Sequence, residues 1–286
     1  MNGPSFDPVA YKAGQRRDWT GASVGWRKWW KTLETAFRPV ADRLVQLAGV
    51  RAGHRVLDIA TGIGEPAVTA SRVVGPAGRV VATDMSPGML EIARERAADL
   101  GLGNVEFREM DAEALDLPEN SFDAALCRFG LMFLPDVDRA LGGIRRLLVP
   151  GGGFATSVWG EPDRVPYLSV TMGTITRELD LPPPPPGAPG LFSLADGDAL
   201  ASRFEAAGFA EVETERLRVA IEYPSLDEYI QFVQEVSVPI KNLLADVTPE
   251  RKAEVWRAVA AAHEGSVDAD GKLRLWGESI LVAGRR

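Results

Sequence analysis

The segment LDIATGIGEPA, residues 57–67, constrains the fold more than any other part of the chain. It is typical of a buried strand that ends in a glycine turn and opens a helix. Gly62 and Gly64 remove the side chains that would keep a ligand away from the backbone, and Pro66 suits the first turn of a helix. Because Asp58 ends the strand, its carboxylate is expected at the sheet edge where open α/β folds bind ligands. We therefore expect a nucleotide-like ligand at this turn.

The rest of the chain alternates strand patterns with helical ones, which indicates a parallel sheet covered by helices. Ser86 and Pro87 are typical of an N-cap and a first helical position. Gly208 is expected to end the helix before the sixth strand. The expected strands are 55–60, 79–84, 105–109, 122–127, 153–159, 211–221 and 273–284.

Two further acidic residues follow the expected strands, Asp84 after the second and Asp111 after the third. The glycine spacing together with Asp84 also fits a dinucleotide site, so an NAD-dependent oxidoreductase is one alternative. Two features disfavour it: Asp58 separates the strand from the glycines, and the glycine turn has no Lys or Arg to offset a pyrophosphate. Three acidic strand ends suit a ligand that carries an amine, a ribose diol and an adenine.

Five motifs in order give the chain its family resemblance: VLDIATGIGEP, VVATDMSPGML, EFREMDAEALDLPENSFD, AALCRFGLMFLPD and LLVPGGGFATSVW. With these motifs the chain resembles the class I S-adenosylmethionine-dependent methyltransferases. Within that family it is similar to the small-molecule branch that includes the ubiquinone and menaquinone C-methyltransferases. The resemblance implies an α/β, Rossmann-like, doubly wound and mostly parallel seven-stranded sheet with an antiparallel last strand, plus helical lid insertions at both ends of the chain.

The expected division of the chain follows from the same resemblance. Residues 1–50 would form an N-terminal helical lid, 51–160 the cofactor-binding core, and 161–222 a loop, helix and strand that complete the core. Residues 223–270 would be a helical cap over the substrate, and 271–286 the final strand. The segment LPPPPPGAPG, residues 181–190, is expected to be a stiff polyproline II connection after the fifth strand; a docking site for a proline-recognising partner is the alternative.

S-adenosylmethionine is the cofactor that the resemblance implies, with S-adenosylhomocysteine as the product. Asp58 and the backbone around Ala60 and Gly62 would hold the methionine amine, Asp84 the ribose hydroxyls and Asp111 the adenine. Two alternatives stay open, since Asp58 could simply cap the turn and Asp84 the helix after it. The cofactor-binding candidates are Asp58, Ala60, Thr61, Gly62, Gly64, Asp84, Met85, Asp111, Ala112, Cys127 and Arg128.

The candidates for an acceptor pocket are mostly aromatic: Trp29, Trp30, Phe129, Met132, Phe133 and Tyr229. Trp26, Trp29 and Trp30 have a spacing that places three indoles on one helical face, either as a lid over a flat acceptor or as packing against the sheet. Met132 and Phe133 could equally face the sheet. Tyr229 lies in a helical insertion, residues 225–265, where core packing explains it as well as a pocket does.

The expected chemistry follows from an electrophilic methyl group on the donor, which requires a nucleophile held in line and the exclusion of water. We expect C- or O-methylation of a small, partly apolar acceptor. His54 and His263 are the only histidines, and neither matches the His base of many O-methyltransferases. No acidic cluster has metal-ligand spacing, so no metal is expected. A non-catalytic S-adenosylmethionine-binding protein and a non-methylating enzyme that uses the same cofactor stay as alternatives.

Composition excludes several partners. A net charge of −8 and a pI near 5.0 disfavour bulk DNA or RNA as a substrate. The single Cys127 excludes an intramolecular disulfide and fits a reducing compartment. The N-terminal sequence has no apolar signal core, and no apolar run is long enough to span a bilayer. We therefore expect a cytoplasmic protein with no membrane partner, whose acceptor and oligomeric state the sequence leaves open.

Overall fold

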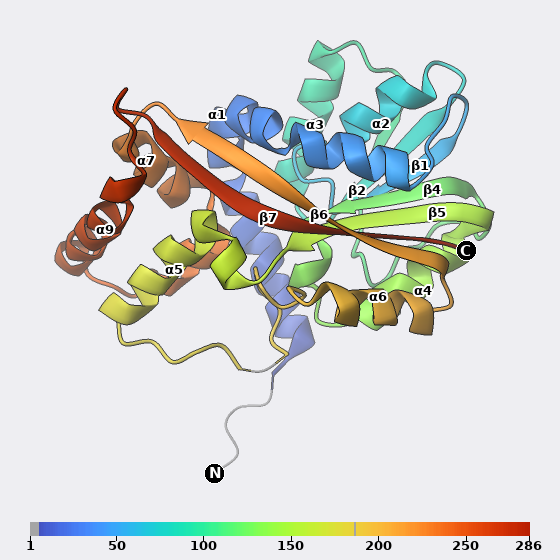
Figure 1. Cartoon of the computed structure of the whole chain (residues 1–286). Helices are drawn as coiled ribbons and strands as arrows, with labels where there is room; N and C mark the ends of the chain where they lie inside the picture. The colour runs from blue at the N-terminus through green and yellow to red at the C-terminus, as the bar shows by residue number, and fades with distance from the viewer. Residues whose placement is uncertain (1–5, 186) are drawn as a thin grey trace.

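The computed structural model describes residues 6–185 and 187–286 (Figure 1). One sheet organises the chain, in the order β3-β2-β1-β4-β5-β7-β6. Its strands are β1 Arg55–Ile59, β2 Arg79–Asp84, β3 Val105–Glu109, β4 Phe122–Arg128, β5 Leu148–Trp159, β6 Ala210–Tyr223 and β7 Leu273–Arg285. Strands β1 to β5 pair in parallel, and β7 runs antiparallel to both β5 and β6. The fold prediction is confirmed.

The helices are α1 Pro8–Leu47, α2 Ala67–Val74, α3 Pro87–Asp99, α4 Val137–Leu147, α5 Pro166–Glu178, α6 Gly197–Ala206, α7 Leu226–Val236, α8 Val238–Leu243 and α9 Pro249–His263. Within residues 6–185 and 187–286 there are also three short 3₁₀ turns, η1 Leu131–Phe133, η2 Pro162–Arg164 and η3 Glu264–Ser266. Helix α3 begins as expected, since the Ser86 hydroxyl accepts a hydrogen bond from the Met89 N–H and Pro87 follows the cap. Among the described helices none is long and apolar enough to cross a membrane.

The order of the strands reverses between β1 and β4, because β2 follows β1 on one side while β4 pairs on the other. At such a point the connections leave in opposite directions and open a crevice at the carboxyl ends of the strands. The glycine turn after β1 and the loop after β4 both lie here. The sheet topology therefore places the predicted site.

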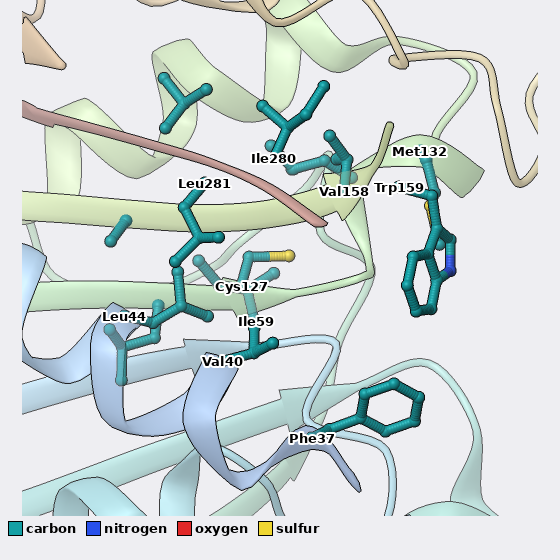
Figure 2. Close-up of a cluster of buried hydrophobic side chains, with 14 of the residues drawn as sticks. Phe37, Val40, Leu44, Ile59, Cys127, Met132, Val158, Trp159, Ile280 and Leu281 are labelled. Carbon is teal, nitrogen blue, oxygen red and sulfur yellow. The ribbon is translucent and has the colours of Figure 1, made fainter. Parts of the chain in front are cut away.

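Helix α1 packs along the sheet and contacts helices α3 and α7. Phe37, Val40 and Leu44 are buried and lie on one side of the strands, while Val158 and Ile280 lie on the other (Figure 2). The middle of the same helix contacts α7, and Lys12 near its start pairs with Asp111, which follows β3. One 40-residue helix is thus both a core element and a wall of the crevice.

The region between β5 and β6 differs from the expectation. Turn η2 and helix α5 follow β5, so the proline-rich segment comes after α5 instead of directly after the strand. Pro186, inside that segment, lies outside the described residues. Helices α5, α7 and α9 group together at one end of the sheet (Figure 1).

Candidate cofactor site

A cavity of about 1050 Å³, including its mouth, lies at the reversal point. Helix α1 forms one wall, and the glycine turn and the segments that follow β2, β3 and β4 form the other. Most of the predicted cofactor residues line it: Ala60, Thr61, Gly62, Asp84, Met85, Asp111, Ala112 and Arg128. The structure therefore brings together residues from four separate sheet segments.

The backbone at the cavity wall adopts left-handed conformations at two neighbouring strand ends. Ala60 after β1 has φ +54°, Gly62 has φ +56°, and Phe129 after β4 has φ +55°. Non-glycine residues adopt this region at a cost of about 1–2 kcal/mol, and such residues cluster at functional sites. A Cβ atom built on Gly62 meets no heavy atom within 4 Å, so a side chain here would occupy open space at the cavity. The turn thus leaves room for a ligand against the backbone.

Asp84 lies at the centre of this wall with 9% of its surface exposed. Its Oδ2 accepts a hydrogen bond from the Gly62 N–H at 2.8 Å, and its Oδ1 accepts one from the Ser86 N–H at 2.8 Å. Burial raises the pKa of Asp84 to about 6, against the lowering effect of these N–H groups. Each carboxylate oxygen keeps a further lone pair. The arrangement fits two hydroxyls of a ribose.

Asp58 lies behind the wall and not on it. Its side chain is fully buried, and Oδ2 accepts hydrogen bonds from the Thr61 hydroxyl at 2.5 Å and the Ala67 N–H at 2.9 Å. Among the described residues none donates to the buried Oδ1, and burial raises the pKa of Asp58 to about 7. The structure therefore favours the capping role over direct contact with a methionine amine, because the carboxylate already satisfies the turn.

Gly64 and Cys127 are the other two candidates that do not line the cavity. Gly64 has φ +99° and packs against Ala93 of α3, which makes it a packing position. The Cys127 thiol is buried in the core between neighbouring strands (Figure 2), and burial raises its pKa to about 12. A role for Cys127 through its backbone stays a prediction.

Of the six acceptor candidates, Phe129 and Phe133 line the cavity. Phe129 stacks on Trp159 with ring centroids 4.4 Å apart, and Phe133 meets Trp19 edge to face at 5.5 Å. These two rings follow β4 as expected. Met132, between them, is 2% exposed and belongs to the core.

The structure does not bring Trp29, Trp30 and Tyr229 to the cavity. Trp29 packs on Phe232 of α7, and its indole N–H donates to Glu235 at 2.6 Å. Trp30 packs beneath the Arg96 guanidinium at 4.8 Å. The indoles of Trp26, Trp29 and Trp30 diverge because the helix contacts different neighbours along its length, and of these three only Trp26 lines the cavity.

Tyr229 belongs to a separate buried polar network. Its hydroxyl lies 2.6 Å from the Thr171 hydroxyl, which in turn lies 2.9 Å from His263 Nε2. His263 is 1% exposed, and burial lowers its pKa to about 4. This network holds α5, α7 and α9 together, so the core interpretation of Tyr229 is the one that the structure supports.

Four residues in the first half of α1 that were not predicted from the sequence also line the cavity: Tyr11, Lys12, Gln15 and Trp19. Lys12 Nζ pairs with Asp111 at 2.8 Å and with Glu113. Tyr11, Gln15 and Trp19 recur every four residues, which is the spacing of one helical face, and Trp26 continues the row. That spacing was the available signal. Within the described ranges, no group of three or more His, Cys, Asp or Glu side chains is placed to hold a metal ion.

A protein-family model described as "Methyltransferase domain" matches residues 56–152. The ubiquinone/menaquinone biosynthesis C-methyltransferase UbiE of Pseudomonas putida is 44% identical over 119 residues, which is 41% of this chain and 46% of that protein. The chain spans about half the length of the curated relatives that it matches.

Solved structures share the fold. The YcgJ protein from Bacillus subtilis has 22% identity and a TM-score of 0.57, covering 87% of this chain and 98% of that one. The 4+2 cyclase SpnF has 25% identity and a TM-score of 0.54, covering 88% and 81%.

Proposed function

The chain carries a class I S-adenosylmethionine-dependent methyltransferase domain, and from that premise we propose that the protein methylates a small, partly apolar organic acceptor at carbon or oxygen. The observation that carries this proposal is the composition of the cavity. It combines the glycine turn, Asp84 and Asp111 with the rings of Trp19, Trp26 and Phe133.

The polar residues of the cavity suit the cofactor. Gly62 would let it approach the backbone, Asp84 would hold the ribose, and Met85 with Ala112 would contact the adenine. Asp111 accepts a hydrogen bond from the Glu113 N–H at 2.9 Å and pairs with Lys12, which leaves lone pairs for an adenine amino group. Bound S-adenosylmethionine supplies a methyl group that is already electrophilic.

The aromatic rings of the cavity suit a flat acceptor. Trp19 meets Trp26 at 5.9 Å and Phe133 at 5.5 Å, both edge to face, so the three rings form one continuous wall. Such a wall orients a planar molecule and excludes water, which are the main contributions a protein makes to this displacement. Aromatic faces also stabilise a nearby cation, and the sulfonium group of the cofactor is such a cation.

The test uses methyl-labelled S-adenosylmethionine with a panel of phenols, quinols and other flat acceptors, after binding of S-adenosylhomocysteine has been measured by calorimetry. Label in an organic product supports the proposal. The same titration with NAD is the control, and NAD binding without S-adenosylhomocysteine binding would overturn the assignment.

A second function has one specific observation in its favour, the likeness to the 4+2 cyclase SpnF over most of both chains. A protein of this kind would convert its substrate without moving the methyl group. The labelled assay separates the two, because a new product that contains no label would favour the non-methylating enzyme.

A further inference from the structure

Gln15 lies in the first half of α1, is half-buried and lines the cavity. Its side-chain Oε1 accepts a hydrogen bond from the indole N–H of Trp19 at 2.9 Å. An indole nitrogen can only donate, so this bond fixes which end of the Gln15 amide is the oxygen and which is the amino group. The amino group points away from the indole N–H, because the two ends of an amide diverge from one carbon. The protein therefore sets the orientation of this amide.

Trp19 is itself held in place by its neighbours. Its ring meets Trp26 at 5.9 Å and Phe133 at 5.5 Å, and it packs against the buried side chains of Ile63, Met89 and Ile92. A polar group that is oriented before a ligand arrives loses less conformational entropy when the ligand binds. The Gln15 amide is such a group, and it lies beside the aromatic rings.

The donor groups that α1 brings to the cavity differ in whether they are already used. Lys12 is engaged in two ion pairs, and the indole N–H of Trp26 donates to the Val236 carbonyl at 3.1 Å. In residues 6–185 and 187–286, the Gln15 amino group and the Tyr11 hydroxyl donate to no protein acceptor. An amide amino group has two N–H donors, so Gln15 offers both of them to a ligand.

We propose that the Gln15 amide selects the acceptor by donating to an oxygen on its ring, and that this oxygen belongs to a phenol or an enol. This inference rests on the proposed function and narrows its substrate class. The rings of Trp19, Trp26 and Phe133 suit any flat molecule of the right size, because burial of apolar surface is not directional. Phenol and enol oxygens, in contrast, accept hydrogen bonds and also make the acceptor a nucleophile, which methyl transfer requires.

Two probes of nearly the same shape test the amide by fluorine NMR, with the protein saturated with S-adenosylhomocysteine. Pentafluorophenol is ionised at neutral pH, and pentafluorotoluene has a methyl group in place of its oxygen. Because hydrogen bonds to ionised groups are strong, Gln15→Leu should weaken pentafluorophenolate binding by roughly 10–100-fold. The same variant should bind pentafluorotoluene within about twofold of the wild type, since the aromatic rings are unchanged.

Gln15→Glu separates the donors from the shape of the side chain. It keeps an oxygen for the Trp19 indole but cannot donate, and its charge repels a phenolate. We expect it to lose pentafluorophenolate as Gln15→Leu does, and to bind pentafluoroaniline, whose amino group donates, more tightly than the wild type. Gln46→Leu is the matched control, since Gln46 lies on the same helix but is exposed and does not line the cavity. Unchanged binding of S-adenosylhomocysteine shows that each variant folds.

Equal losses of the phenolate and the toluene in Gln15→Leu, or no loss of either, would overturn the inference and leave the proposed function standing. A selective loss in Tyr11→Phe, with none in Gln15→Leu, would assign the oxygen to the Tyr11 hydroxyl and overturn the role of Gln15. A wild type that binds S-adenosylhomocysteine but neither probe would overturn the inference as well. Failure of the wild type to bind S-adenosylhomocysteine would overturn the proposed function and this inference together.

Discussion

The Asp84 carboxylate at the end of β2 accepts a 2.8 Å hydrogen bond from the backbone N–H of Gly62, 22 residues earlier in the chain. The bond links the second strand to the glycine turn of the first. It orients the carboxylate toward the cavity and holds the turn in its left-handed conformation. Because Asp84 shapes the turn and is also proposed to bind the cofactor, its truncation should have a measurable effect.

Asp84→Ala is expected to weaken S-adenosylhomocysteine by roughly 10–100-fold, because charged hydrogen bonds to two hydroxyls are lost. Calorimetry measures the change. Asp99→Ala, at the exposed end of α3, is the control and should bind like the wild type. Unchanged affinity in Asp84→Ala would remove Asp84 from the cofactor site.

Asp58 should make the ligand-free protein less stable as the pH rises. Because burial raises its pKa from 3.8 to about 7, the folded state retains a proton that the unfolded state has lost. The contribution of this proton to the free energy of unfolding is complete below pH 4 and is lost as the pH passes 7. Its total is on the order of 4 kcal/mol. The free energy of unfolding of the wild type minus that of Asp58→Asn should fall between pH 4 and pH 8. A flat difference would contradict the buried, protonated carboxyl.

His263 should have the opposite effect, and make the protein less stable as the pH falls. Burial lowers its pKa from 6.5 to about 4, so only the unfolded state takes up a proton between these values. Its contribution is complete above pH 6.5 and is lost as the pH falls toward 4, by roughly 3 kcal/mol. Urea unfolding at pH 7.5 and pH 5 should show a smaller loss of stability in His263→Gln than in the wild type. Equal losses would place the imidazole in solvent.

Gly130→Ala should destabilise the protein and impair the site. A Cβ atom here would lie 2.7 Å from the Ala60 Cβ and 2.8 Å from the Cys127 Sγ, so the ends of β1 and β4 would have to separate. Overpacking of this kind costs about 1–3 kcal/mol. Gly142→Ala, inside α4 where nothing lies within 4 Å, should instead stabilise by about 0.5–1 kcal/mol. Thermal unfolding compares the two, and a neutral Gly130→Ala would show that the strand ends can adapt.

Lys12→Met should loosen the first turns of α1. The ion pairs of Lys12 with Asp111 and Glu113 connect this helix to the loop after β3. Loss of about 1 kcal/mol would raise local opening roughly fivefold, which hydrogen exchange of residues 8–20 would detect. Lys31→Met, which removes only a contact with the Trp30 ring, should leave that exchange unchanged. Unaltered exchange in Lys12→Met would mean that Tyr11 and Trp19 hold the wall without the ion pairs.

The strands and their functional ends could be predicted because the signals are local. Apolar runs that stop at an acidic residue, glycines at a turn and a Ser-Pro helix start each act within a few residues. They placed Asp84 and Asp111 on one sheet edge, and the bounds of β2 and β3 match the expectation. The residues of α1 that form the cavity wall were harder to predict from the sequence, because Trp26, Trp29 and Trp30 fit one helical face equally well.

The sequence by itself determined the sheet, the edge at which the cofactor is predicted and the residues that end each strand. The reason is that hydrophobic periodicity and the Gly, Pro and acidic residues at element ends act locally along the chain. Only the tertiary structure decided which side chains face the cavity. Asp58 turned inward because Thr61 and Ala67 supply its hydrogen bonds, and Glu65 took a place on the wall. Trp19 reached the site while Trp29 packed on α7. These choices depend on neighbours far apart in sequence, whose positions become defined only when the helix packs on the sheet.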